Sequence, residues 1–207
     1  LLTAFQGWQG SVVVGSGLEP FVVTVHSVLA LIIVSLLLWV ALQVYYEAHP
    51  AEARDNYMPP GSAQGVKTLW GVAIIQVMLG TQLREGIEIM REQHPTWTAA
   101  QWIMKIGGIS HLHMALGILV AVLTFWLGRR IVRGTEHLTP FVRQAVAASM
   151  VLVGLQLITG LVFIFIDIHP MVQVFHLWIA SLYVGALLIV FASARRARQP
   201  LQMEFGT

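Results

Sequence analysis

Six apolar segments dominate this sequence and restrict what it can fold into. They span residues 1–16, 20–45, 67–89, 108–130, 141–166 and 170–194. About 20 apolar helical residues cross the roughly 30 Å hydrocarbon layer of a bilayer, so the first segment is short and the others are long enough. Only 11% of the residues are charged, far below the roughly 25% of a soluble domain. The sequence therefore predicts an all-α, polytopic membrane helix bundle with six transmembrane helices.

Charge and cysteine content exclude several classes of function. The net charge of +2 gives no support to nucleic-acid binding. The absence of cysteine excludes disulfides, thiolate metal sites and cysteine catalysis. The sequence has no HExxH motif and no paired carboxylates, which argues against zinc and di-iron sites.

The polar connections predict how the helices sit in the membrane. The stretch WTAAQWIMKI, residues 97–106, is typical of a short helix lying in the interface, with Trp97 and Trp102 as anchors. Arginines gather in the loop after residue 128 and at the C-terminus, and such residues favour the cytoplasmic side. With six spans, both visible termini are expected in the cytoplasm.

A repeat relates the start of the chain to its end. The residues Gln6, Gly10, Pro20 and His26 recur 150 positions later (156 − 6) as Gln156, Gly160, Pro170 and His176. The repeat predicts two four-helix units, of which the first is incomplete. Since the second unit starts at residue 67, its counterpart would start at 67 − 150 = −83, so about 85 further residues are expected before Leu1. Residues 1–45 would end the first unit, 46–66 would link the units, and 67–207 would form the second. The alternative is a six-helix protein that lost two helices.

Three histidines lie at one expected depth. His26, His113 and His176 each stand about six residues inside a helix that begins at the outer face, or ~9 Å at ~1.5 Å per residue. A buried histidine can simply pack between helices. However, ionisable residues inside a membrane are costly and usually functional. Two histidines at one depth in a four-helix unit suit axial ligation of a haem, which predicts His113 and His176 as iron ligands.

The helix expected over 108–130 offers two histidines, His111 and His113. Because they are two residues apart, only one can point inward. We favour His113, whose face continues through the small residues Gly117 and Ala121. The other histidines (His49, His94, His137 and His169) fall in loops or at helix ends, where solvation is expected.

A polar stripe adds further candidates. Gln76, Gly80 and Arg84 are four residues apart and share one helix face. Gly80 would let a flat macrocycle approach, and the Arg84 guanidinium would pair with haem propionates. Arg84 could instead extend to lipid headgroups. For the neighbouring Glu85 and Glu88, solvation is the default expectation.

These residues carry a resemblance to a known family. LGTQLREGIE, the histidine of 108–130, QLITGLVF, and P-x5-H followed by LWIAS resemble the C-terminal half of heme A synthase. FQGWQGSVVVGSGLEPFVVTVHSVLAL resembles the close of its N-terminal half, so the likeness covers nearly the whole chain. The resemblance implies an eight-helix, two-unit protein. It further implies that His113 and His176 ligate a haem b, and that His26 is a catalytic, metal-ligating residue of a site for the substrate haem O.

The resemblance also implies a reaction. A methyl group of haem O would be oxidised to formyl in successive hydroxylations, with water supplying the oxygen and haem b relaying electrons. The implied partners are the farnesyltransferase that supplies haem O and the terminal oxidase that receives haem A, in a bacterial or archaeal plasma membrane. The Glu-x-x-His motif and the extracellular cysteine pairs of the family are missing, and Met114 replaces a common arginine. The first departure leaves open whether this chain is active alone.

Two other classes of function stay open from the sequence. One is a bis-His di-haem electron-transfer cytochrome, and the other is a non-catalytic membrane assembly subunit. The unit around His26 separates them, because a pure electron carrier needs no substrate pocket. The chain could also form a homo-oligomer.

Overall fold

A computed structural model describes residues 1–17, 19–134 and 137–197. The described chain is helical and has no strand. Its helices are α1 (Leu2–Gly15), α2 (Pro20–Ala48), α3 (Pro50–Arg54), α4 (Ser62–Gln93), α5 (Ala99–Ile106), α6 (Gly108–Arg133), α7 (Pro140–Phe165) and α8 (Pro170–Ala194). The all-α prediction is confirmed, and so is the short helix expected within 97–106, which is α5.

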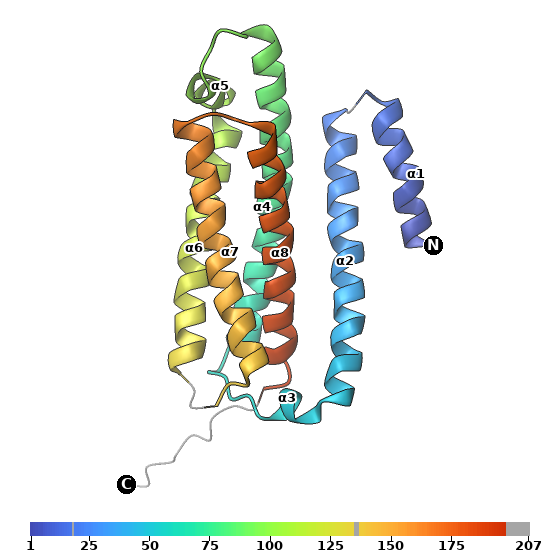
Figure 1. Ribbon diagram of the computed structural model, residues 1–207, viewed down its shortest axis with the longest axis vertical. Helices are drawn as coiled ribbons and strands as arrows, with labels where there is room; N and C mark the ends of the chain where they lie inside the picture. Colours follow the sequence, from blue (N-terminus) through green and yellow to red (C-terminus); the bar gives the residue numbers. More distant parts are fainter. Residues whose placement is uncertain (18, 135–136, 198–207) are drawn as a thin grey trace.

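Helices α4, α6, α7 and α8 form a four-helix bundle (Figure 1). Around its perimeter α4 packs on α6, α6 on α7, α7 on α8, and α8 on α4, so α6 and α8 stand at opposite corners. Helix α2 packs beside this bundle against α4 and α8, and α1 packs against α2 on the side away from the bundle. We call the two ends of the molecule the α5 end and the α3 end, after the short helix that lies at each (Figure 1).

Five helices of the described chain are long and apolar enough to cross a membrane, namely α2, α4, α6, α7 and α8. Helix α1 has 14 residues. At 1.5 Å per residue it reaches about 21 Å, less than the roughly 30 Å of a hydrocarbon layer. The polytopic helical bundle is confirmed, but the predicted six spans are corrected to five of full length.

Local sequence signals set most helix boundaries. Proline occupies the first turn of α2, α7 and α8, where its missing N–H has no helical partner to lose. A capping box between Thr98 and Gln101 starts α5. Gly61 adopts φ +79°, a left-handed conformation that glycine tolerates, immediately before α4. Helix α4 therefore starts at Ser62, five residues before the predicted 67. The expected loop 46–66 also contains helix α3, which the sequence analysis did not predict.

The bundle has an apolar core in its α3 half. The residues that form it include Val66, Leu69, Val120, Leu127, Ile131, Val142, Val146, Val153, Val184, Leu187 and Val190. The hydroxyls of Thr124 on α6 and Tyr183 on α8 meet at 2.5 Å and join the opposite corners of the bundle. Toward the α5 end the interior becomes polar, because the half-buried Gln76, His113, Gln156 and His176 lie there. The fold thus places the two glutamines and the two histidines in the half of the bundle nearer the α5 end, beyond the apolar core.

Candidate functional site

His176 is held on α8 by two side chains of α7. The Gln156 amide nitrogen donates to the His176 carbonyl at 2.5 Å, and the Thr159 hydroxyl lies 2.6 Å from the ring atom Nδ1. The Thr159 hydroxyl also lies 3.0 Å from the carbonyl of Leu155 and 3.1 Å from the carbonyl of Gln156, either of which accepts a hydroxyl hydrogen. When Thr159 donates to one of these carbonyls, its oxygen accepts from Nδ1–H of His176. This tautomer leaves Nε2 with a free lone pair, as an iron ligand requires.

His26 on α2 is held in the same way by α1. The Gln6 amide nitrogen donates to the His26 carbonyl at 3.1 Å, and the Gln9 side-chain oxygen lies 3.0 Å from Nδ1. The amide nitrogen of Gln9 points to the Val22 carbonyl at 3.4 Å, which turns its oxygen toward the imidazole. An amide oxygen only accepts, so the Gln9 contact favours the tautomer with the proton on Nδ1, whereas the Gln6 amide nitrogen, 3.2 Å from the same atom, favours the other. The Gln9 contact is the shorter of the two. In the tautomer with the proton on Nδ1, Nε2 is the acceptor and lies 3.1 Å from the Gln6 amide nitrogen.

His113 on α6 is clamped by α4. The Gln76 amide nitrogen donates to the His113 carbonyl at 2.8 Å. A Cβ at Gly80 would lie 3.1 Å from Cε1 of His113, so any larger residue would press on the ring and shift it. The Nδ1 atom of His113 is buried without a hydrogen-bond partner among the described residues. His111 is exposed, so His113 is the inward-facing histidine of the two.

One arrangement therefore occurs three times. In each case a glutamine amide donates to the carbonyl of a histidine on the partner helix, and a glycine follows the glutamine by four residues. The glycines Gly10 and Gly80 face the histidine rings, whereas Gly160 has open space above it. The 150-residue repeat showed two of these clamps, but the third, at Gln76, was seen only as part of a polar stripe.

Sequence reasoning missed the residues that contact Nδ1 of two of the histidine rings. Gln9 and Thr159 also stand 150 positions apart (159 − 9), and the side-chain oxygen of each lies within hydrogen-bonding distance of Nδ1 of its histidine, at 3.0 Å and 2.6 Å. They escaped notice because the repeat was found by identical residues, and these two differ in type. Comparing hydrogen-bonding capacity at the same offset would have found them.

His113 and His176 occupy matching turns of opposite corners. His113 follows the first residue of α6 by five positions (113 − 108), and His176 follows the first residue of α8 by six (176 − 170). Both helices begin at the α5 end (Figure 1). The described residues hold no group of three or more side chains that would bind a metal ion directly. Two imidazoles facing from opposite corners instead suit a haem, whose porphyrin supplies the remaining ligands.

The residues fit such a group on two counts. The buried Nδ1 of His113 has no hydrogen-bond partner among the described residues. A buried polar atom without a partner calls for an explanation, and a ligand that turns the ring toward a partner would supply one. The Gly80 backbone approaches the same ring without a side chain in between. Both features lie in the polar half of the bundle, above the core.

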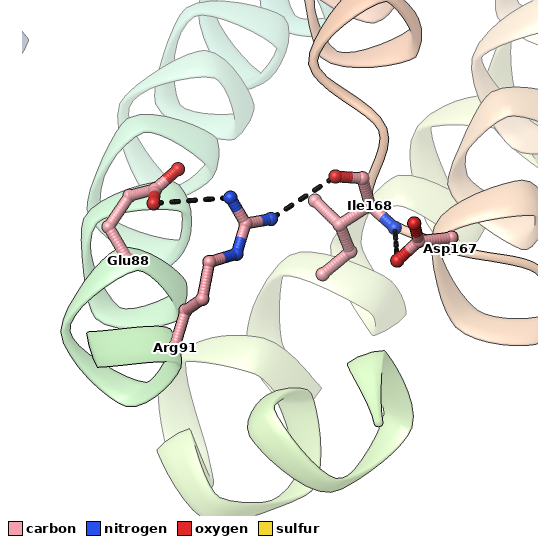
Figure 2. A network of polar contacts seen from close by, with 4 residues as sticks. All are labelled: Glu88, Arg91, Asp167 and Ile168. Atoms are coloured by element: carbon pink, nitrogen blue, oxygen red, sulfur yellow. Dashed lines mark hydrogen bonds and ion pairs between the residues drawn. The ribbon is translucent and has the colours of Figure 1, made fainter. Parts of the chain in front are cut away.

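Helix α5 covers the α5 end of the bundle. Trp102 and Ile103 pack with Ile87 of α4 and Ile168 of the turn between α7 and α8. Figure 2 shows the polar part of this cover, in which Arg91 donates to Glu88 at 3.4 Å and to the Ile168 carbonyl at 3.2 Å. Glu88 is thus half-buried in an ion pair rather than simply solvated. This network ties α4 to the turn that leads into the His176 helix.

Arg84 lies exposed near the α5 end of α4. Its pairing with a haem propionate stays a prediction. The expectation that His94 is solvated is wrong. His94 is half-buried and stacks on Trp97, with 3.8 Å between the ring centroids.

A polar bridge connects the two histidine regions. The Thr24 hydroxyl on α2 meets the Thr81 hydroxyl on α4 at 2.9 Å and accepts from the Gln82 amide at 2.6 Å. Thr24 stands two residues before His26, and Thr81 directly follows Gly80. The bridge therefore fixes the turn that carries His26 against the turn that contacts His113.

Comparison with known proteins identifies a family for this chain. A search of curated proteins and a search of solved structures each find no match. A family model described as "Cytochrome oxidase assembly protein" (COX15-CtaA) matches residues 1–188 of the 207-residue chain. Since the match takes in every helix that carries a clamped histidine, the chain belongs to the COX15-CtaA family of cytochrome oxidase assembly proteins, the heme A synthase family.

Proposed function

We propose that this protein oxidises the ring methyl group of haem O to a formyl group, and that His113 and His176 hold a haem b which serves the reaction. Membership of the family supports a role in cytochrome oxidase assembly and haem A synthesis. The proposal of a haem b site rests on one observation. His113 and His176, each held by a glutamine of a neighbouring helix, lie at matching turns of the two helices at opposite corners of the bundle.

The chemistry requires a route for electrons. Conversion of a methyl to a formyl group takes one oxygen atom from water and releases four electrons and four protons. Haem b, when bound, supplies one-electron transfer toward an acceptor in the membrane. The protein's part is to hold two neutral imidazoles, and Thr159 does this for His176 by accepting from Nδ1–H so that Nε2 stays free.

His26 is proposed as the catalytic histidine that holds the substrate. The Gln9 contact favours the proton on Nδ1, which leaves Nε2 to bind the iron of haem O. Gln6 would then keep only its bond to the His26 carbonyl and release Nε2. The bridge through Thr24 holds this turn at a set separation from the His113 turn, as electron transfer between two haems requires.

The proposal assigns roles to the parts of the chain. Residues 1–45 would belong to the unit for haem O, 46–66 would connect the units, and 67–207 would form the haem b unit. Gln76 and Gly80 would line the haem b site, and Arg84 would pair with its propionates. We propose a plasma membrane as the location, a farnesyltransferase as the source of haem O, and self-association as a further possibility.

The experiment that tests this function compares His26→Ala with His111→Ala in protein purified from membranes. We expect His26→Ala to keep the absorption spectrum of the haem held by His113 and His176, but to stop conversion of haem O to haem A. The exposed His111 provides the control, since its replacement should change neither property.

Extraction of haem from the purified protein separates the rival functions. Haem O or haem A beside haem B supports the synthase. Haem B alone would favour an electron-transfer cytochrome, and no haem would favour a structural assembly subunit. Normal production of haem A by His26→Ala would show that the catalytic assignment is wrong.

A further inference from the structure

A polar cavity opens at the α3 end, far from the histidines. It has a volume of about 290 Å³ and lies where α2, α3 and α8 meet. Its walls are formed by Gln43, Tyr46, Glu47, Pro50, Arg54 and Arg196. Neither the histidine clamps nor the proposed reaction uses any of these residues.

The guanidinium of Arg196 is fixed in the wall of this cavity. It stacks over the Tyr46 ring at 4.8 Å and donates to the Gln43 side-chain oxygen and to the Ala192 carbonyl. The Tyr46 hydroxyl is itself tied to Ser193 at 2.6 Å, so the ring beneath the cation cannot swing away. A guanidinium has five N–H donors, and these two contacts engage one on each terminal nitrogen. Other N–H groups of this fixed guanidinium remain to donate to an anion.

The charged side chains in the cavity wall indicate how much negative charge a bound anion would carry. Arg54 and Arg196 contribute two positive charges, and Glu47 contributes one negative charge. The net single positive charge matches a phosphodiester, which carries one negative charge. Arginine also suits phosphate oxygens because its planar fork can bind two of them at once.

The surroundings of the cavity indicate a lipid. The cavity lies at the end of α2 and α8, which are both candidate membrane spans. On α2 the exposed Leu37, Val40 and Val44 are three and four residues apart, and the same spacing leads to Glu47 in the cavity wall. An acyl chain could lie along this apolar stripe while its headgroup enters the cavity.

The whole α3 end attracts such a headgroup. Its described cations are Arg54, Lys67, Arg129, Arg130, Arg133, Arg143, Arg195 and Arg196, against the carboxylates Glu47, Glu52 and Asp55. Basic surfaces at the end of membrane spans concentrate anionic lipids. We propose that the cavity is a binding site for the phosphodiester of an anionic phospholipid, held between Arg54 and Arg196.

The test titrates the purified protein in detergent with phosphatidylglycerol and follows bound lipid by native mass spectrometry. Arg54→Gln should weaken binding about tenfold, because it removes a charge-assisted hydrogen bond. Glu47→Gln should strengthen binding, since it removes the only carboxylate of the wall. The side chains of Glu47 and Arg54 are exposed, so neither substitution should affect folding. Arg129→Gln is the matched control, an exposed arginine at the same end on α6, and it should leave binding unchanged.

Three results would overturn the proposal. Equal weakening by Arg54→Gln and Arg129→Gln would show a diffuse charge effect rather than a site. Equal binding of phosphatidylcholine, which carries a compensating positive charge, would remove the charge selectivity. Displacement of phosphatidylglycerol by an equal concentration of inorganic phosphate would identify a site for free phosphate instead of a lipid.

Discussion

Replacing Gln156 by leucine tests whether the glutamine clamp positions its histidine. Leucine has a similar volume but cannot donate to the His176 carbonyl, which Gln156 reaches at 2.5 Å. The carbonyl keeps its own helical hydrogen bond, so no buried acceptor is left without a partner. Hydrogen bonds between membrane helices contribute about 0.6 kcal/mol on average and ~1.7 kcal/mol at most. We therefore expect Gln156→Leu to lower the free energy of unfolding by this amount.

The effect on haem retention is bounded by the same energy. If the bond acts wholly through the placement of His176, the dissociation constant of haem rises by about threefold to eighteenfold. The assay is haem content after dilution of the purified protein, read from its absorption spectrum. Gln144→Leu on the same helix is the control, because Gln144 is exposed. Equal haem loss in both variants, or none in Gln156→Leu, would refute the positioning role.

Two further substitutions probe the other contacts of the histidines. Gly80→Ala should displace the His113 ring, since its Cβ would lie 3.1 Å from Cε1, and should shift the haem spectrum; Gly71→Ala, which meets nothing within 4 Å on the same helix, should leave the spectrum unchanged. Thr159→Val removes the acceptor for Nδ1–H of His176 and makes the imidazole a weaker electron donor to iron. The midpoint potential of the haem should rise in a redox titration, and Thr159→Ser should restore it; an unchanged potential in Thr159→Val would contradict the assigned tautomer.

Most of the fold could be predicted from hydropathy and prolines. A bilayer demands long apolar helices, so the positions of α2, α6, α7 and α8 followed directly from the sequence. Helix α3 was missed because it has only five residues and lies beyond any apolar segment, so hydropathy gives no signal for it. The apolar first segment predicts a span, but its 14-residue helix is too short to be one. Apolar character without sufficient length does not establish a crossing.

The candidate site was predictable in its ligands but not in its supports. Ionisable residues in apolar helices are rare enough that His26, His113 and His176 stood out individually. The clamps did not, because a hydrogen bond from Gln76 to the carbonyl of His113 joins two helices whose pairing no local pattern reveals. Helix packing decides which faces meet, and only then do the glutamines acquire a partner.

The central claim is that His113 and His176 ligate one haem, and the absorption spectrum of the purified protein tests it most directly. The wild-type protein should show the low-spin signature of two imidazole ligands. His113→Ala and His176→Ala should each abolish this signature, whereas His111→Ala should preserve it. A low-spin spectrum that survives in both of the first two variants would contradict the account.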